Sequence, residues 1–325
     1  MNRRTIFGTV GGGLLLAMPL SAVPQQVKKL PVVGVLNLAV GPRSTTVDAA
    51  RQGLRELGYV DGQTITFDVR FAAAKPEAFP ALADDLVRRK VDVLLVSGPA
   101  AVRAATEATS TIPIVALDYE SDPIEAGFAR SFARPGGNLT GCFLDQPGLT
   151  GKWLGLLGAA VPGARFTAVL RDPTTGPWQL AAIRRIAETL KIQLHVIELQ
   201  NLEELDHALE VAINAGSRAL VQLSAPIFDN QSKRIADLTA KHRLPAISLF
   251  RRFAEAGGLM SYGPDQVEFT KRLAVYVDKI LKGAKAADLA IEQPTKFDFV
   301  LNLKTAKTLG LTIPQSLRVQ AELIE

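Results

Sequence analysis

The stretch VDVLLVSGPAAVRAATEATSTIPIVALD, residues 91–118, decides the fold. It begins and ends with short runs rich in Val, Ile and Leu, residues 91–98 and 113–118, and the segment between them is predicted to be a helix from Ala100 to about Thr109. Short apolar runs bounded by glycine and proline, alternating with helices, are typical of parallel sheets covered on both faces. The stretch therefore predicts a strand–helix–strand unit of an α/β protein.

The same alternation extends in both directions from this unit. On its N-terminal side we predict strands at residues 31–39 and 64–72 and helices at residues 45–59 and 76–90. The pattern starts again after residue 145, with predicted helices at 149–162, 177–191, 202–216 and up to Lys241, and predicted strands at 166–172, 193–200, 218–225 and 245–250. Two successive series of similar length predict two similar lobes, each built on an open parallel sheet.

The segment ARPGGNLTGCF, residues 133–143, joins the two series. Its paired glycines suggest a phosphate-binding loop, but a P-loop requires the spacing G-x-x-x-x-G-K-[ST] between a strand and a helix. Here Arg134 is predicted to end a helix, and residues 138–143 are predicted to form a strand. Proline after a helix end and glycines that adopt positive φ are typical of a turn. We therefore interpret the segment as a turn that delivers a strand.

The first 22 residues, MNRRTIFGTVGGGLLLAMPLSA, are typical of a secretory signal peptide. They contain an early arginine pair, an apolar run from Ile6 to Leu20, and small residues at Ser21 and Ala22. This pattern predicts cleavage near Ala22 and a mature protein in the periplasm, and the arginine pair suggests twin-arginine export. The alternative is an N-terminal membrane anchor, which the short, glycine-rich run disfavours.

Charge and reactive residues exclude several classes of function. The formal net charge is +5, or about +3 without Arg3 and Arg4, which is too small and too scattered to indicate nucleic-acid binding. The three histidines have no paired Cys or His at metal-ligand spacing, and no G-x-S-x-G motif occurs. The single cysteine, Cys142, can form no internal disulfide and has no obvious base partner. We therefore predict no catalytic residues, no metal and no cofactor, and a protein that is not an enzyme.

Ligand-binding residues are expected at the carboxyl ends of the strands, beside helix N-termini. The segment SGPAAVRAA, residues 97–105, places small residues at a helix start, where free N–H groups favour an anion, although an ordinary turn would use the same residues. Trp178 and Phe228 either sandwich an aromatic ligand or lie in the core, and Arg171 either pairs with a ligand carboxylate or is neutralised by Asp172. The candidate ligand-binding residues are Asn37, Ser97, Gly98, Ala100, Ala101, Tyr119, Asp122, Pro123, Asp172, Trp178, Ser224, Phe228 and Phe250.

Seven phrases spread along the mature chain carry a resemblance to one family. They are GLRELGYVDGQTI (53–65), ATSTIPIV (108–115), SFARPGGNLTG (131–141), IADLTAKHRLPAI (235–247), EAGGLMSYGPD (255–265), YVDKILKGAKAADLAIEQPTKF (276–297) and NLKTAKTLGLTIP (302–314). Together they resemble the substrate-binding proteins of ABC transporters related to the tryptophan- and tyrosine-binding group. The resemblance covers essentially the whole mature chain.

This resemblance implies a type I periplasmic-binding fold, in which two Rossmann-like lobes are joined by three crossing segments and enclose the ligand. The crossings would lie at residues 138–143, at residues 257–265 and around residues 295–301. One lobe would then comprise residues 27–140 and 263–293, and the other residues 141–262 and 294–325.

The resemblance also implies a function. The protein would be the periplasmic solute-binding component of an ABC importer, a monomer that captures an amino acid-like or aromatic acid ligand and delivers it to a permease in the inner membrane. A ligand sensor that docks on a membrane receptor, and an enzyme that uses the same cleft, are the alternatives.

By position, the turn at 97–101 and the loops at Asp122–Pro123 and Asp172–Pro173 would face the cleft. The chain departs from the family pattern in two places. Asp172 stands where relatives have Asn before proline, and LFRRF (249–253) stands where relatives more often read PSREF.

Overall fold

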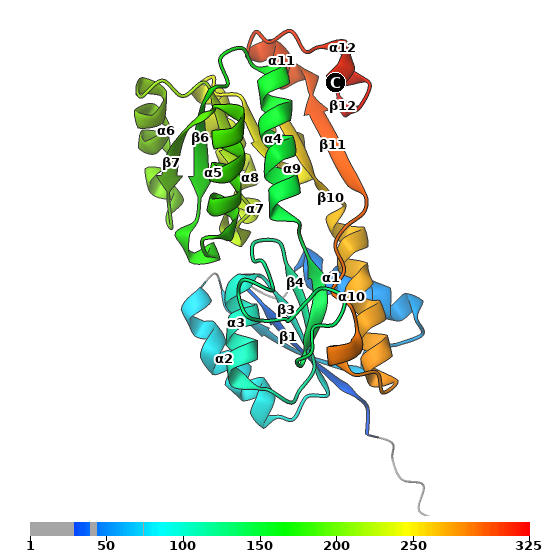
Figure 1. Cartoon of the computed structure of the whole chain (residues 1–325). Coiled ribbons are helices and arrows are strands. Elements are labelled where there is room, and N and C mark those ends of the chain that lie inside the picture. The colour runs from blue at the N-terminus through cyan, green and yellow to red at the C-terminus, as the bar shows by residue number, and fades with distance from the viewer. Residues whose placement is uncertain (1–28, 40–43, 74) are drawn as a thin grey trace, which may run out of the picture.

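The computed structural model describes residues 29–39, 44–73 and 75–325. The predicted signal peptide, residues 1–22, lies outside the described residues. The chain forms two α/β lobes, one above the other in Figure 1, each with helices on both faces of a sheet. Two lobes with mainly parallel sheets confirm the predicted fold class.

The sheet of the first lobe has the strand order β2-β1-β3-β4-β5, and all its neighbouring strands are parallel. Its strands are β1 (Val32–Asn37), β2 (Thr66–Phe71), β3 (Val93–Ser97), β4 (Ile114–Asp118) and β5 (Leu139–Phe143). Helices α1 (Thr45–Glu56) and α10 (Gln266–Leu281) pack together on one face, and α2 (Phe79–Arg88) and α3 (Pro99–Ala108) pack together on the other. The fully buried β3 and β4 explain why their sequence reads as continuous apolar runs.

The sheet of the second lobe has the strand order β12-β11-β10-β9-β8-β6-β7. Its strands are β6 (Phe166–Arg171), β7 (Gln193–Glu198), β8 (Ala219–Gln222), β9 (Ala246–Ser248), β10 (Met260–Pro264), β11 (Phe297–Asn302) and β12 (Glu322–Ile324). One face carries α4 (Gln146–Ala160) and α5 (Trp178–Leu190), and the other carries α6 (Leu205–Asn214), α7 (Pro226–Asn230), α8 (Ser232–Lys241) and α9 (Arg251–Glu255). The short helices α11 (Leu303–Thr308) and α12 (Gln315–Arg318) end the chain, and single turns of 3-10 helix lie at η1 (Pro76–Ala78), η2 (Pro173–Thr175), η3 (Leu202–Glu204) and η4 (Ala286–Asp288). The sheet is not wholly parallel, because β11 returns from the first lobe and pairs antiparallel with β10.

The chain crosses between the lobes three times, after β5, after β10 and before β11. The first two crossings end at aspartates that cap the next helix. Asp145 Oδ1 accepts from Gly148 N at the start of α4, and Asp265 Oδ1 accepts from Val267 N at the start of α10. Both strands stay in their sheets until just before these caps.

The glycine-rich segment before β5 is a turn that delivers a strand, as predicted. Gly136 has a φ of 77°, and the Asn138 side chain donates to Thr109 O (2.9 Å) and Ile112 O (2.8 Å), which fixes the turn against the end of α3. The helix expected to end at Arg134 is not formed. Instead, Asp122 O accepts from Ala126 N, and Gly127 with a φ of 75° ends this single turn.

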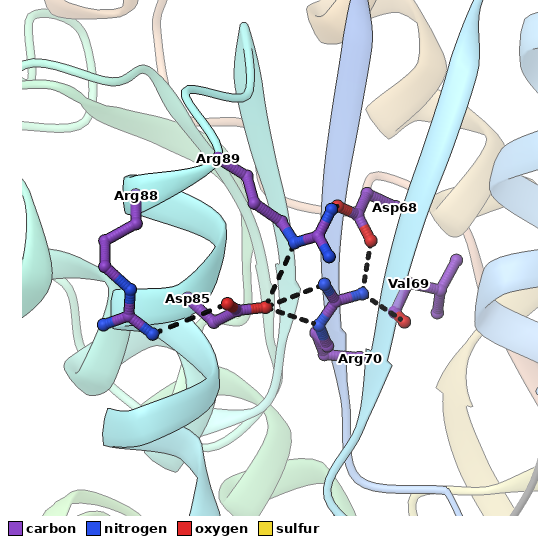
Figure 2. Close-up of polar contacts among 6 residues, drawn as sticks. All are labelled: Asp68, Val69, Arg70, Asp85, Arg88 and Arg89. Carbon is purple, nitrogen blue, oxygen red and sulfur yellow. Dashed lines mark hydrogen bonds and ion pairs between the residues drawn. The ribbon is translucent and has the colours of Figure 1, made fainter.

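A network of charged side chains ties α2 to the edge strand β2 (Figure 2). Arg70 on β2 donates to Asp85 on α2 through Nε (3.0 Å) and Nη2 (2.8 Å), and it also pairs with Asp68. Arg88 and Arg89 add weaker pairs to Asp85, at 3.5 Å and 3.4 Å.

In the described part of the chain, no helix is both long enough and apolar enough to cross a membrane.

Candidate functional site

A cleft with two connected compartments lies between the lobes. The small compartment has a volume of about 210 Å³ and the large compartment about 690 Å³. The small compartment is lined by Asn37, Leu38, Ala39, Ser44, Thr46, Ser97, Gly98, Leu117, Tyr119, Glu120, Pro226, Asp229, Asn230, Phe250, Arg252 and Gln266. The large compartment shares Leu38, Ala39, Ser97, Gly98, Pro226 and Asn230 with it and adds Pro76, Glu77, Phe79, Pro99, Ala100, Ala101, Asp172, Thr174, Thr175, Gln200, Ile227 and Gln231. Residues of both lobes therefore line one continuous site.

The turn between β3 and α3 brings the lobes together. Gly98 has a φ of 86°, which L side chains rarely adopt, and its N–H donates to Leu117 O at 2.9 Å. A Cβ added to Gly98 would lie 3.5 Å from the Pro226 ring of the second lobe. The positive φ therefore favours glycine at the start of α3, where the turn lies close to α7 of the second lobe.

Aromatic side chains from both lobes meet at one wall of the small compartment. Tyr119, which follows β4, lies edge-on to Phe250 of the second lobe and stacks with Phe269 of α10, with ring centroids 6.1 Å apart in each pair. Burial raises the pKa of Tyr119 well above its ordinary value, so the phenol stays neutral. This wall offers apolar surface to a ligand.

Two buried carboxyl groups lie at the carboxyl end of β4, that of its last residue Asp118 and that of Glu120. Asp118 Oδ1 accepts from Glu120 N (2.9 Å) and Ser121 N (3.0 Å), which folds the chain back so that Glu120 lines the small compartment. Burial raises the pKa of both carboxyl groups, and the neighbouring charge of Asp118 raises that of Glu120 further. The pair therefore retains a proton at a pH where exposed carboxyl groups are ionised.

Glu120 also makes a direct hydrogen bond between the lobes. Ser224 Oγ donates to Glu120 Oε1. Gln179 holds Ser224 in place, because its Oε1 accepts from Ser224 N and its Nε2 donates to Ser224 O, both at 2.8 Å. Ser224 thus contacts the site through Glu120.

The second lobe contributes one ion pair to the small compartment. Arg252 Nη1 lies 3.7 Å from Asp229 Oδ2, while Asp229 Oδ1 is buried and has no hydrogen-bond partner among the described residues. Burial raises the pKa of Asp229, and the charge of Arg252 opposes this only in part. The wall therefore carries a carboxyl oxygen that lacks a donor.

The structure brings most of the sequence-predicted residues to the cleft. Those that line it are Asn37, Ser97, Gly98, Ala100, Ala101, Tyr119, Asp172 and Phe250. Asp122 and Pro123 line neither compartment, and Asp122 Oδ1 instead accepts from Ile124 N and Glu125 N.

The aromatic sandwich of Trp178 and Phe228 is not formed. Phe228 is fully buried in the core of the second lobe, because α7 turns its ring toward the sheet. Trp178 lies over Gly176 and lines a separate groove of about 590 Å³ beside Arg103 and Phe128 of the first lobe. Of the two alternatives for these rings, an aromatic sandwich around a ligand or burial in the core, burial in the core is confirmed for Phe228.

The candidate ligand-binding residues predicted from the sequence do not include Glu120 or Asp229. Glu120 lies two residues after the end of the buried strand β4, which is a usable signal for a site residue. Asp229 lies in a five-residue helix whose orientation the sequence does not indicate.

Within the described chain, one group of residues has metal-ligand geometry. Potential ligand atoms of Asp206, Glu210 and His242 lie within 4.8 Å of one another, on α6 and just after α8. Lys241 Nζ is 2.6 Å from Asp206 Oδ2, so an ammonium group already neutralises this carboxylate. None of these residues lines the cleft.

Comparison with known proteins identifies the family of this chain. The family model for ABC transporter substrate binding protein matches residues 33–324. The chain belongs to this family. A relative, the tyrosine-binding protein of Clostridioides difficile, is 22% identical over 296 residues, which cover 87% of this chain and 82% of that protein.

Solved structures show the same fold. An ABC domain in complex with L-Trp from Streptococcus pneumoniae matches with a TM-score of 0.81 at 22% identity, covering 91% of this chain and 100% of that one. The trehalose repressor from Escherichia coli matches with a TM-score of 0.55 at 14% identity, covering 81% and 96% of the two chains. The fold is thus the type I periplasmic-binding fold.

Proposed function

We propose that this protein is the periplasmic solute-binding component of an ABC importer and captures a small organic ligand between its lobes. The observation that carries the proposal is a cleft lined by both lobes in a chain that belongs to the substrate-binding family over residues 33–324. The partner proposed for the loaded protein is a permease in the inner membrane.

The ligand class proposed is the aromatic amino acids and similar molecules. A curated relative is named for tyrosine, and a structural relative holds L-Trp. In this chain, Tyr119 and Phe250 provide an apolar wall, and Asn37, Ser97 and Asn230 provide polar groups in the same compartment. Such a combination of apolar surface and a few polar groups is typical of small-molecule sites.

Binding is proposed to work by lobe closure without chemical change of the ligand. A ligand that contacts Ser97 on one lobe and Phe250 on the other makes its full set of contacts only when the lobes are together. It therefore favours the closed form by its differential affinity. The three crossings act as the hinge.

A thermal-shift screen of the purified protein against amino acids and aromatic acids tests the ligand class. A ligand present at 100 times its dissociation constant adds about 2.7 kcal/mol of stability. Mass spectrometry of the ligand after incubation tests the absence of turnover, because a chemically altered ligand would indicate an enzyme.

Uptake of the labelled ligand by cells that lack the gene tests the transport role. We expect uptake to fall in these cells. Unchanged uptake, together with ligand-dependent binding to a membrane receptor, would indicate a sensor. Mass spectrometry of the exported protein should find a mature N-terminus near Val23, and an intact, membrane-retained Met1 would contradict the proposed location.

A further inference from the structure

We propose that the small compartment binds an ammonium group of the ligand between Glu120 of the first lobe and Asp229 of the second. The proposal rests on the ligand-binding function proposed above and narrows its ligand class to molecules that carry an amino group. Purely anionic aromatic acids are then excluded.

The charges around the cleft favour a cation. Among the described residues that line the two compartments, the carboxyl groups are those of Glu77, Glu120, Asp172 and Asp229, whereas the one guanidinium is that of Arg252. Arg252 is already paired with Asp229, and its side chain is 43% exposed. An anionic ligand would meet four carboxyl groups and a single guanidinium that is already paired, so the lining offers it little compensation for the water that it loses.

The two carboxyl groups that we propose to bind the ammonium group, those of Glu120 and Asp229, lack strong hydrogen-bond donors among the described residues of the protein itself. Glu120 is only 2% exposed, and its Oε1 accepts from the Ser224 hydroxyl, which carries no charge. Asp229 Oδ1 is buried without any hydrogen-bond donor in the described chain. A buried acceptor oxygen without a donor is costly, and a charge-assisted hydrogen bond from an ammonium group would supply a charged donor to both carboxyl groups.

An ammonium group fits this place better than a metal ion does. An ammonium group brings three N–H donors, and both Glu120 and Asp229 offer acceptor oxygens to the same compartment. A divalent hard cation would need six or more oxygen ligands and would compete with the guanidinium of Arg252 beside Asp229.

The position of the two carboxyl groups couples charge to lobe closure. Glu120 and Asp229 belong to opposite lobes, so one ammonium group contacts both only when the lobes are together. Binding also releases a proton, because the raised pKa of Glu120 keeps it protonated until a cation approaches. The titratable groups that act on Glu120 or on its neighbour Tyr119 include Asp118 of the first lobe and Asp229 of the second, and Arg252, which is paired with Asp229, lines the same compartment.

Matched sets of probes test this proposal. Each L-amino acid is compared by thermal shift and calorimetry with the amine that lacks its α-carboxyl group and with the acid that lacks its α-amino group. For the side chain that binds best, we expect the amine to retain measurable binding and the acid to bind at least about tenfold more weakly than the amino acid. Calorimetry in two buffers of different ionisation enthalpy should also detect proton release by the wild type.

Two isosteric variants and one control locate the effect. Glu120→Gln and Asp229→Asn should each weaken binding of the amino acid by about 10- to 100-fold. Glu120→Gln should also abolish the proton release, which a merely structural role of Glu120 would not do. Asp84→Asn, on the exposed face of α2, removes a carboxylate outside the cleft and should change neither quantity.

The outcomes separate this proposal from the function on which it rests. If the acids bind as tightly as the amino acids, the ammonium proposal is wrong and the ligand-binding function stands. If no amino acid or amine binds the wild type, both this proposal and the proposed ligand class are wrong. If Ca²⁺, Mg²⁺ or Zn²⁺ alone stabilises the wild type and fails to stabilise Glu120→Gln, the compartment is a metal site and the proposal is overturned.

Discussion

Gly141 lies where β5 passes so close to β4 that no side chain fits. A Cβ at this position would be 2.0 Å from Ala116 O, and its φ of 135° is a conformation that L side chains rarely adopt. Gly141→Ala should therefore lower the free energy of unfolding by at least about 2–3 kcal/mol, because the strand pair must separate. The measurement is the midpoint of urea unfolding.

Gly137→Ala is the matched control for this prediction. It lies in the same glycine-rich segment, has a negative φ, and an added Cβ would meet no atom within 4 Å. Equal unfolding midpoints for the two variants would show that β5 can move away from β4 at little cost.

The buried carboxyl of Glu120 makes stability depend on pH. The pKa of Glu120 is raised in the folded protein, whereas in the unfolded chain it takes the ordinary value for Glu of about 4.3. Between these two pKa values the folded state holds more protons, so its stability is fully present below about pH 4 and falls as the pH rises. Glu120→Gln should flatten this decline and be more stable than the wild type at about pH 8.

Thermal melts from about pH 4 to pH 8 check this expectation. Glu107→Gln, on the exposed face of α3, controls for the loss of a surface charge. A wild type and a Glu120→Gln variant whose melting temperatures change in parallel would show that Glu120 ionises normally in the fold.

At the scale of elements, the charged network in Figure 2 fixes α2 against the edge of the first sheet. Arg70 makes two hydrogen bonds to Asp85, and its side chain is only 20% exposed. Arg70→Gln should therefore cost about 1–2 kcal/mol of unfolding free energy.

Arg88→Gln tests whether geometry or charge is responsible. Arg88 reaches the same carboxylate through one contact at 3.5 Å, and its side chain is 69% exposed. We expect this variant to cost less than about 0.5 kcal/mol, since exposed ion pairs contribute little. Equal losses in the two variants would mean that the network acts only through its net charge.

The strands could be predicted from the sequence because buried parallel strands leave a local signal. The apolar runs at 91–98 and 113–118 correspond to β3 (Val93–Ser97) and β4 (Ile114–Asp118). The antiparallel pairing of β10 with β11 could not be predicted in this way, because it depends on a chain that leaves the lobe and returns. The helix expected before Arg134 failed for a local reason, since Gly127 ends that segment after one turn.

The candidate site was predictable only in part. Strand ends indicate which residues reach the cleft, and Ser97, Tyr119 and Phe250 do line it. Whether a ring points into a cleft or into a core depends on the rotation of its helix. A five-residue helix such as α7, which carries Phe228, is too short to show this rotation by periodicity.

At the scale of the whole molecule, contacts between described residues of the two lobes meet at the cleft. They include the hydrogen bond from Ser224 to Glu120 and the edge-on contact of Tyr119 with Phe250. Hinged lobes with few packed contacts separate and close at low cost, and a ligand that bridges them shifts this equilibrium. We therefore expect small-angle scattering to show compaction of the wild type when a tightly bound ligand is added.

The two tryptophans provide a test of this closure within the protein itself. Trp178 of the second lobe faces first-lobe residues across a groove, whereas Trp153 is fully buried and donates from Nε1 to Tyr262 O (2.7 Å) within its own lobe. Lobe movement should change the surroundings of Trp178 only, so a ligand-induced change in fluorescence should persist in Trp153→Phe and disappear in Trp178→Phe. Because Trp178 lines neither compartment of the cleft, Trp178→Phe should still bind the ligand. A fluorescence change that survives in Trp178→Phe, or a wild type that binds tightly without compaction, would show that binding does not move the lobes.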